Sequence, residues 1–309
     1  MQRKNTDDGH LYGLKRVLGR CGLLPRVRLV AARPYDDASL KAVAEACRAN
    51  VVHALLVGEK RTISERAGRL GIEKGLFEIV HTEEQEILER TASIHRDGEA
   101  DFIMKGLVST GNFIHVLLDP KWNIRTDDIL SHVGMFEIPE SERIFLMSDG
   151  ALNILPNFTR KMEIVKNAVQ TARRLGTGKI RVAMLAALEK VRLPAMPATR
   201  DAFLMKRFST TGYFGRCEID GPFAFDNAID PEKAVTKGVG GAVAGQANVL
   251  IVPNIETGNV IWKSITVLNR QTAAGVVVGG RCPIVLPSRS DDFETKLLSI
   301  RFARLVLGT

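Results

Sequence analysis

The chain has 309 residues, of which 45% are hydrophobic and 25% charged, and its formal net charge is +8. These values are ordinary for a globular protein with one large or two medium domains, and they exclude fibrous and broadly disordered classes. The longest apolar runs are too short to span a bilayer and the polar start shows no secretory signal, so we expect a cytoplasmic protein.

The first half of the chain alternates short apolar runs with amphipathic segments. The predicted order is a strand at 27–32, a helix from Ala38, a strand at 53–57, a helix at 63–70, a strand at 77–80, a helix at 83–96 and a strand at 101–104. In the first helix, Leu40, Val43 and Cys47 recur at the spacing of one helical face. Such alternation predicts an α/β sheet covered by helices on both faces.

A second series of elements begins near Ser131. Strands are predicted at 133–138, 144–147, 180–186, 249–252 and 284–286, and helices at 161–175, 201–208, 231–238, 259–268 and 292–307. The restart of the rhythm, rather than a linker, predicts a second α/β domain from about residue 131.

Cysteine usage and charge indicate which classes of partner the chain can have. Cys21, Cys47, Cys217 and Cys282 are scattered without a CxxC pair, which predicts reduced thiols and no metal site. Basic residues are spread along the chain, and only three Tyr and two Trp are available to stack on bases. We therefore expect no nucleic-acid or membrane partner, and phosphorylated small molecules suit the positive charge better.

Polar residues that follow strands are the candidate ligand-binding groups, because open parallel sheets bind ligands at the carboxyl ends of their strands. In "MKGLVSTGNF", Lys105 and Gly106 follow a predicted strand, and Ser109 and Thr110 precede a helix. A cation, a glycine and hydroxyls suit a phosphate. A capped helix beside a surface lysine explains the same residues equally well.

Two further clusters carry amides and carboxylates among apolar neighbours. Asn153 lies within "ALNIL", where a buried amide needs hydrogen-bond partners, so binding and structure are balanced explanations. In "IDGPFAFDNAI", a turn is expected at Asp220, Gly221 and Pro222. The Asp226 and Asn227 pair that follows is more than a turn needs, which favours a functional site.

The last two clusters flank the final predicted strands. Gly258, Asn259 and Lys263 belong to a loop and helix after the strand at 249–252, and the glycines before that strand do not have the GxGxxG spacing of a dinucleotide site. Ser288, Arg289 and Asp291 follow the strand at 284–286 and precede a helix. A guanidinium at a helix N-terminus suits a phosphate, although a capped helix with a surface arginine is the alternative.

Together these segments resemble the phosphate acetyl/butyryl transferase family, in particular its phosphate butyryltransferase branch. The resemblance rests on "MKGLVST", "SHVGMFEIP", "SDGALNILP", "IDGPFAFDNAI", "AGQANVLIVPNIETGNVIWK" and "GVVVGGRCPIVLPSRSDD", which occur in this order. It implies a two-domain fold like that of isocitrate and isopropylmalate dehydrogenases, with residues 1–130 plus 287–309 in one domain and 131–286 in the other. Coenzyme A would bind in the cleft between them, and the chain would form a homodimer or higher homo-oligomer.

The resemblance also implies an activity: reversible transfer of a short acyl group between coenzyme A and inorganic phosphate, by direct attack in a ternary complex. Ser288 and Arg289 match the family's Ser-Arg pair, and Asp291 matches the carboxylate of the butyryl branch. Acyl-CoA and phosphate would be the substrates, with no permanently bound cofactor and no metal. Departures from the family pattern are Asn254, Pro287, Ser290 and Trp262.

Three alternatives remain open from the residues. A metal-dependent NAD(P) hydroxyacid dehydrogenase of the same fold would need clustered aspartates, which are dispersed here. A non-catalytic acyl-CoA or phosphate-binding paralogue is suggested by Asn254 and Pro287. Nucleic-acid binding lacks a recognisable module.

Overall fold

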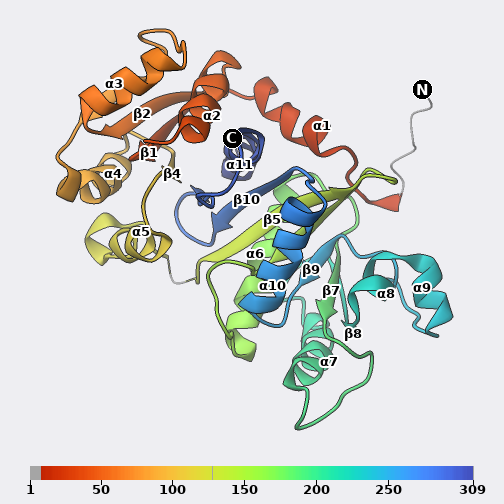
Figure 1. The fold of residues 1–309 in the computed structure, drawn as a ribbon. Coiled ribbons are helices and arrows are strands. Elements are labelled where there is room, and N and C mark those ends of the chain that lie inside the picture. The colour runs from red at the N-terminus through yellow and green to blue at the C-terminus, as the bar shows by residue number, and fades with distance from the viewer. Residues whose placement is uncertain (1–7, 127, 309) are drawn as a thin grey trace. The chain divides into compact units, whose positions relative to one another are not determined.

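The computed structural model describes residues 8–126 and 128–308, which form two compact units (Figure 1). Unit 1 consists of Leu130–Gln271 with the N-terminal segment up to Val17, and unit 2 consists of Leu18–Ile129 and Thr272–Thr309. Each unit is an α/β structure with a mixed sheet.

The sheet of unit 2 is parallel except at one edge. Its strands are β1 (Val27–Ala32), β2 (Val52–Gly58), β3 (Glu78–His81), β4 (Phe102–Lys105), β10 (Ala273–Val278) and β11 (Ile284–Val285), in the spatial order β3-β2-β1-β4-β11-β10. Only β10 runs antiparallel to its partner in this set, with Val277 opposite Ile284 of β11. The four parallel pairings place the carboxyl ends of β1, β2, β4 and β11 at one edge.

Helices of unit 2 cover this sheet. They are α2 (Asp37–Arg48), α3 (Lys60–Arg69), α4 (Ile87–Arg96), α5 (Thr110–Leu117) and α11 (Phe293–Leu307), with 3₁₀ turns η2 (Arg20–Leu23), η3 (Glu84–Glu86) and η4 (Pro120–Trp122). Figure 1 shows α2 beside α11, and α4 beside α5, which also contact each other in pairs. Asp36 caps α2 by accepting a hydrogen bond from the Ser39 amide, and Asp292 caps α11 in the same way through Thr295.

The sheet of unit 1 has five strands. They are β5 (Ser131–Ile138), β6 (Arg143–Ser148), β7 (Arg181–Leu185), β8 (Glu218–Phe223) and β9 (Val249–Ile251), in the order β5-β6-β9-β7-β8. The β5 and β6 strands form an antiparallel hairpin, and β6, β9, β7 and β8 are parallel. The carboxyl ends of the parallel strands therefore meet at one edge of this unit.

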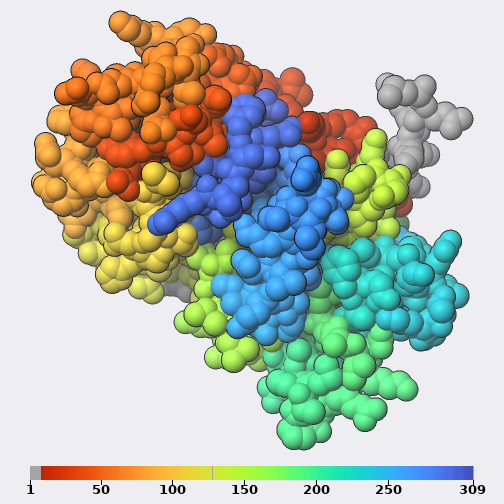
Figure 2. Space-filling model, in the orientation of Figure 1, coloured from red at the N-terminus to blue at the C-terminus, as the bar shows by residue number. Residues whose placement is uncertain are grey.

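The helices of unit 1 begin where those strands end. They are α6 (Phe158–Arg174), α7 (Pro197–Ser209), α8 (Phe225–Ile229), α9 (Pro231–Thr236) and α10 (Ile255–Lys263), which continues into a π-helical turn η5 (Ser264–Leu268). A further helix, α1 (Leu14–Gly19), crosses the division between the units along the chain. In the space-filling view the segment of α10 and η5, in light blue, lies on the surface (Figure 2). Val260 of α10 and Val267 and Leu268 of η5 are exposed.

Most predicted elements are present, with two differences in the strands. The Asp-Gly-Pro segment predicted as a turn is part of β8, so that prediction is wrong. β8 is an edge strand, where a proline does not break a ladder on both sides. The second difference is β10, whose six buried residues were not predicted as a strand.

The domain bounds also differ from the predicted 1–130 with 287–309, and 131–286. The N-terminal segment lies in unit 1, because the amide of Gly13 donates to the carbonyl of Glu142 at 2.9 Å. Residues 272–286 lie in unit 2, because β10 pairs with β11 and the Gly275 amide donates to Ser299 Oγ in α11 at 2.9 Å. None of the helices in the described residues combines the length and apolar composition that crossing a membrane requires.

Candidate functional site

A buried lysine lies at the carboxyl edge of the unit 2 sheet. Lys105 is the last residue of β4 and is only 2% exposed. Its ammonium donates to the carbonyl oxygens of Gly106 and Val108, both at 3.3 Å, and forms no ion pair with a described residue. A buried ammonium held only by two long hydrogen bonds is poorly stabilised in its charged form.

The pKa of Lys105 reports this environment. Burial is the main cause that lowers it to about 8, and the positive charges of Lys296 and Arg289 lower it further. Asp291 and Asp36 offset part of the effect. Three cations therefore act on one another at this edge of unit 2, which favours an anionic ligand.

Lys296 is the second buried cation of the cluster. It lies in α11, is 2% exposed, and its Nζ donates to Asp36 Oδ1 at 2.7 Å and Ser39 Oγ at 3.1 Å. Burial alone would raise the pKa of Asp36, but hydrogen bonds from Lys296 and Ser39 outweigh it and leave the pKa below its ordinary value. The sequence did not single out Lys296; its signal is a lysine among the apolar residues of the final helix.

The Ser288–Asp292 loop joins β11 to α11. The amide of Ser288 donates to Asp291 Oδ2 at 2.8 Å, and the hydroxyls of Ser288 and Ser290 lie 3.0 Å apart. Arg289 is exposed and makes no hydrogen bond or ion pair with the described residues, so its guanidinium is available to a ligand. Ser288, Arg289 and Asp291 thus share a short loop at the same edge as Lys105.

The other two residues predicted in unit 2 have different surroundings. A Cβ on Gly106 would lie 2.3 Å from the Arg33 carbonyl oxygen, so glycine is required for the end of β4 to pack against the end of β1. Thr110 is exposed in the first turn of α5, which is capped by the Ser109 hydroxyl instead. Roles of both residues in substrate binding stay predictions.

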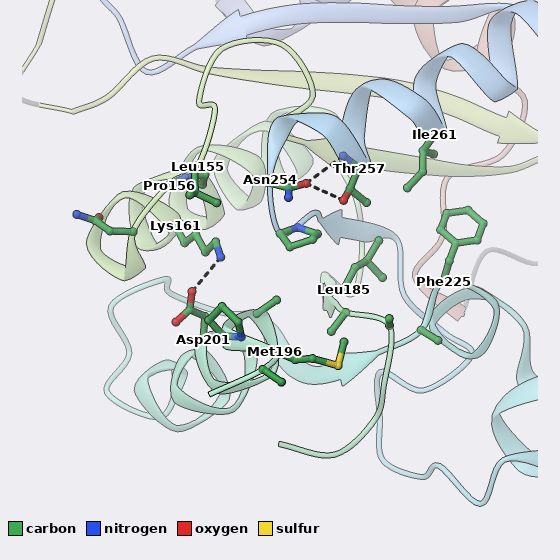
Figure 3. Close-up of a pocket in the computed structure, with 18 residues that line it drawn as sticks. Leu155, Pro156, Lys161, Leu185, Met196, Asp201, Phe225, Asn254, Thr257 and Ile261 are labelled. Carbon is green, nitrogen blue, oxygen red and sulfur yellow. Dashed lines mark hydrogen bonds and ion pairs between the residues drawn. The ribbon is translucent and has the colours of Figure 1, made fainter. Parts of the chain in front are cut away.

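Unit 1 contains a cavity of about 780 Å³ at the carboxyl ends of β7, β8 and β9 (Figure 3). The N-termini of α6, α7 and α10 also contribute residues to it. The lining consists of Leu155, Pro156, Asn157, Lys161, Leu185, Ala186, Ala187, Ala195, Met196, Pro197, Ala198, Asp201, Ala224, Phe225, Pro253, Asn254, Thr257 and Ile261. An apolar cavity with a few convergent polar groups is the usual form of a small-molecule site.

The polar groups of the cavity belong to three helices. Lys161 of α6 and Asp201 of α7 are both buried and form an ion pair at 2.9 Å (Figure 3). Asn254, the N-cap of α10, accepts from the amide of Thr257 at 3.0 Å and from its hydroxyl at 2.7 Å through Oδ1. Lys161, Asp201 and Thr257 were not among the predicted residues. A lysine in the first turn of a helix, where the dipole disfavours a cation, is the signal that identifies Lys161.

Asn153 lies outside this lining and is held by backbone and side-chain partners. Its Nδ2 donates to the Leu130 carbonyl at 2.9 Å and to Asp149 Oδ2 at 2.6 Å. Asp149 Oδ1 in turn accepts from the amides of Ala151 and Leu152. This network accounts for the buried amide, and a contact with substrate stays a prediction.

The residues predicted in and after β8 also lie outside the lining. Asp220 pairs with Lys206 at 2.7 Å, and Asp226 pairs with Lys237 at 2.9 Å. Asn227 is fully buried and donates to Glu189 at 2.6 Å. Gly221 and Pro222 are residues of β8 itself, and Ala224 and Phe225, which follow this strand, line the cavity instead.

The residues of α10 that were predicted to bind substrate lie outside the lining of the cavity. A Cβ on Gly258 would lie 2.6 Å from Gly150 Cα, so this glycine permits close packing of the helix. Asn259 is exposed and Lys263 is half-buried, and neither lines the cavity, whereas Thr257 and Ile261 of the same helix do. Roles of Gly258, Asn259 and Lys263 therefore stay predictions, as does the location of coenzyme A in a cleft between domains.

No group of three or more His, Cys, Asp or Glu side chains within residues 8–126 and 128–308 is arranged to hold a metal ion.

Comparisons with known proteins agree with one another. Residues 90–303 match the family model described as phosphate acetyl/butaryl transferase. The phosphate butyryltransferase of Clostridium beijerinckii is 37% identical over 291 residues, which cover 94% of this chain and 96% of that protein. The phosphate acetyltransferase of Thermotoga maritima is 33% identical, covering 88% and 92% respectively.

A solved structure shows the same relationship in three dimensions. The branched-chain phosphotransacylase of Enterococcus faecalis superposes with a TM-score of 0.80 at 28% identity, covering 91% of this chain and 99% of that one. The predicted resemblance is confirmed: the chain belongs to the phosphate acetyl/butaryl transferase family.

Proposed function

We propose that this protein is a phosphate acyltransferase that moves a short acyl group reversibly between coenzyme A and inorganic phosphate. The observation that carries the proposal is the cation cluster of unit 2, in which Lys105 is buried beside Lys296 and Arg289 and has no carboxylate partner within residues 8–126 and 128–308. Such a cluster gains stability when a phosphate binds. Membership of the family supports the same activity.

The reaction requires a phosphate oxygen to attack the thioester carbonyl while the thiolate of coenzyme A leaves. Arg289 holds the phosphate through a bidentate contact, and Lys105 adds a second positive charge. The hydroxyl or amide of Ser288 stabilises the oxyanion of the tetrahedral intermediate. The intermediate, in which the new C–O bond is already formed, then collapses: the carbonyl double bond is restored as the C–S bond breaks, and the leaving thiolate takes a proton from solvent.

In the reverse direction, Asp291 accepts the thiol proton of coenzyme A. A free thiol has a pKa of about 8.5, so a nearby base speeds formation of the thiolate. One Asp291 oxygen accepts the Ser288 amide hydrogen bond, which orients the carboxylate toward the loop where the reaction is proposed. The acyl phosphate and free coenzyme A are converted to acyl-CoA and phosphate.

Four finer features belong to the same proposal. The fold is that of the isocitrate and isopropylmalate dehydrogenases, the protein works as a homodimer or higher homo-oligomer, and no permanently bound cofactor takes part. Coenzyme A and its acyl thioester are substrates. The enzyme acts in the cytoplasm.

The test is release of free thiol from butyryl-CoA or acetyl-CoA, followed by a thiol-reactive dye with and without phosphate. We expect release that depends on phosphate and falls at least about a hundredfold in Arg289→Ala. Arg281→Ala is the matched control, because Arg281 is also exposed but precedes β11 rather than following it. Thiol release that continues without phosphate would identify a thioesterase instead.

A second candidate function, suggested by the departures at Asn254 and Pro287, is a paralogue that binds these ligands without turnover. Asn254 uses its carbonyl oxygen to cap α10, so the departure from the family pattern has a structural role here. Binding of butyryl-CoA in a titration, combined with no thiol release at saturating phosphate, would support this alternative.

A further inference from the structure

Asp36 joins two helices of unit 2 that are distant in the sequence but lie side by side, α2 and α11 (Figure 1). Its Oδ1 accepts from the Ser39 amide at 2.8 Å and its Oδ2 from the Ser39 hydroxyl at 2.7 Å, which caps α2. The same Oδ1 accepts from Lys296 Nζ of α11 at 2.7 Å, and that Nζ also donates to Ser39 Oγ at 3.1 Å. Asp36, Ser39 and Lys296 therefore form a closed network that fixes the position of the ammonium group.

Capping of a helix does not explain the lysine in this network. Asp292 caps α11 by accepting from the Thr295 amide at 2.8 Å, and it has no lysine partner among the described residues. Lys296 is only 2% exposed, so its ammonium has lost nearly all contact with water. A buried ion pair often stabilises a fold no better than apolar side chains of similar size. The pair of Asp36 and Lys296 therefore requires another explanation.

The neighbouring buried cation, Lys105, supplies that explanation. Lys105 ends β4, and β4 pairs with β11, from which the chain runs directly into the start of α11. Burial is the main cause that lowers the pKa of Lys105 to about 8, and the positive charges of Lys296 and Arg289 lower it further. The carboxylates of Asp291 and Asp36 act in the opposite direction. These four groups, from α2, α11 and the loop before α11, are the charges that act on Lys105.

The two buried ammonium groups compete for charge. When like charges repel each other away from water, one of them loses its proton unless a carboxylate compensates it. Burial opposes ionisation of Asp36, but hydrogen bonds from Lys296 and Ser39 outweigh it and hold the pKa of Asp36 below its ordinary value. Asp36 is therefore a carboxylate at neutral pH, where it balances the charge of Lys296. The charge of Lys105 is then left for an anion.

We infer that Asp36 is a positioning residue of the phosphate site: by balancing Lys296, it allows Lys105 to stay positively charged and to hold the phosphate. Asp36 acts through Lys296 and needs no contact with the phosphate. The inference rests on the proposed function and deepens it, because the sequence motifs of the site include neither Asp36 nor Lys296.

The variant Asp36→Asn removes the charge and keeps the cap, since asparagine caps helices as well as aspartate does. Isothermal titration with inorganic phosphate between pH 6 and pH 9, without acyl-CoA, measures the Kd. At pH 8 we expect the Kd of the variant to be at least about fivefold above that of the wild-type enzyme, because Lys105 then loses its proton at a lower pH. The difference should shrink toward pH 6, where Lys105 is charged in both proteins. Phosphate itself titrates identically in both experiments, so the ratio of the two Kd values reports the protein.

Asp37→Asn is the matched control for this variant. Asp37 is the next residue of the chain, is exposed, and pairs with Arg66 of α3 at 2.7 Å. Its loss should leave the Kd for phosphate at the wild-type value at every pH. If Asp36→Asn gives the same curve as Asp37→Asn, the inference is wrong.

A second variant, Lys296→Met, removes the repelling charge instead. It leaves Asp36 capped by Ser39 and partly exposed to water, so no buried charge is stranded and the variant should fold. We expect the pH above which the Kd rises to move upward by at least about half a unit, because the pKa of Lys105 increases. A Lys296→Met curve that coincides with the wild-type curve overturns the inference, even if Asp36→Asn does not fold.

The double variant tests whether Asp36 acts through Lys296. Adding Asp36→Asn to Lys296→Met should change the Kd at pH 8 by less than about twofold, because the charge that Asp36 balances is already gone. A fivefold effect that persists in the Lys296→Met background would show that Asp36 acts independently of Lys296, which contradicts the inference.

The proposed function fails separately, through absence of phosphate-dependent thiol release from the wild-type enzyme. The phosphate titrations need no turnover, so they decide the role of Asp36 in either case. A wild-type enzyme that releases thiol, but whose pH dependence of phosphate binding is shared by Asp36→Asn and Lys296→Met, disproves only the inference about Asp36.

Discussion

At the scale of single residues, three buried lysines lie at the candidate sites. Lys105, Lys161 and Lys296 are each less than 5% exposed. A buried ammonium is costly unless a partner or ligand compensates it. Lys161 and Lys296 have carboxylate partners, whereas among the residues that the structure describes Lys105 is bonded to backbone carbonyls alone.

The pKa of Lys105 predicts how phosphate binding depends on pH. With a pKa of about 8, Lys105 is charged below pH 8 and loses its proton above it, and each lost proton removes a positive charge from the cluster. The KM for phosphate should rise by up to about tenfold per pH unit above pH 8. Steady-state kinetics at saturating butyryl-CoA measure this profile. Lys105→Met should have a higher KM that no longer changes between pH 8 and 10, and a wild-type KM that is constant over that range contradicts the prediction.

At the scale of elements, the packing of β8 against β7 depends on backbone geometry at Gly221 that the sequence pattern does not reveal. Gly221 lies in β8 with a φ of +150°, and a Cβ there would be 2.7 Å from the Met184 carbonyl oxygen. The close approach holds β8 against the end of β7, from which the cavity lining continues. The Asp-Gly-Pro sequence alone indicates a turn. The contact between β8 and β7 joins strands well apart in the chain, so no local pattern could reveal it.

Gly221→Ala should therefore destabilise unit 1. The added methyl group cannot be accommodated without moving backbone, and we expect a loss of about 1–3 kcal/mol in the free energy of unfolding. Urea denaturation of the variant and of Gly240→Ala measures the effect. Gly240 is the control because a Cβ at that position meets nothing within 4 Å. Equal stability of the two variants would show that β8 adjusts freely.

Helices and the inner strands could be predicted from periodicity, since their apolar faces are local patterns. For α6, Ile164, Val165 and Ala168 are buried as their spacing predicts. Candidate site residues could be grouped from the sequence only where they lie in one segment, as with Ser288, Arg289 and Asp291, whose roles stay predictions. Lys161 with Asp201 and Lys296 with Asp36 are pairs from distant segments, so their proximity follows from the folded sheet and not from the sequence pattern.

At the scale of the whole molecule, both units are assembled from separate pieces of chain. Unit 2 needs β10, β11 and α11 from the C-terminal segment to complete a sheet begun near residue 27. α11 buries most of its side chains, including Leu298, Ile300 and Phe302, and packs against α2. Stability of unit 2 therefore depends on residues far from most of it in sequence.

Removal of residues 293–309 should unfold unit 2 selectively. The deletion exposes the apolar surface that α11 covers, and buried apolar area is the main source of stability. Hydrogen exchange followed by mass spectrometry should show lost protection in β1, β2 and β4, with protection kept in β6, β7 and β9. Retained protection in β1 and β4 would show that α11 is dispensable.

The interleaved pieces have a consequence for synthesis on the ribosome. Residues 130–271 emerge as one uninterrupted stretch, and the N-terminal segment that joins them is already outside the exit tunnel by then. Unit 1 is thus complete before β11, one of the two partner strands of β4, has emerged. The apolar faces of β1, β2 and β4 stay incompletely covered until residues 272–309 follow, and we expect this part of the chain to depend most on a chaperone.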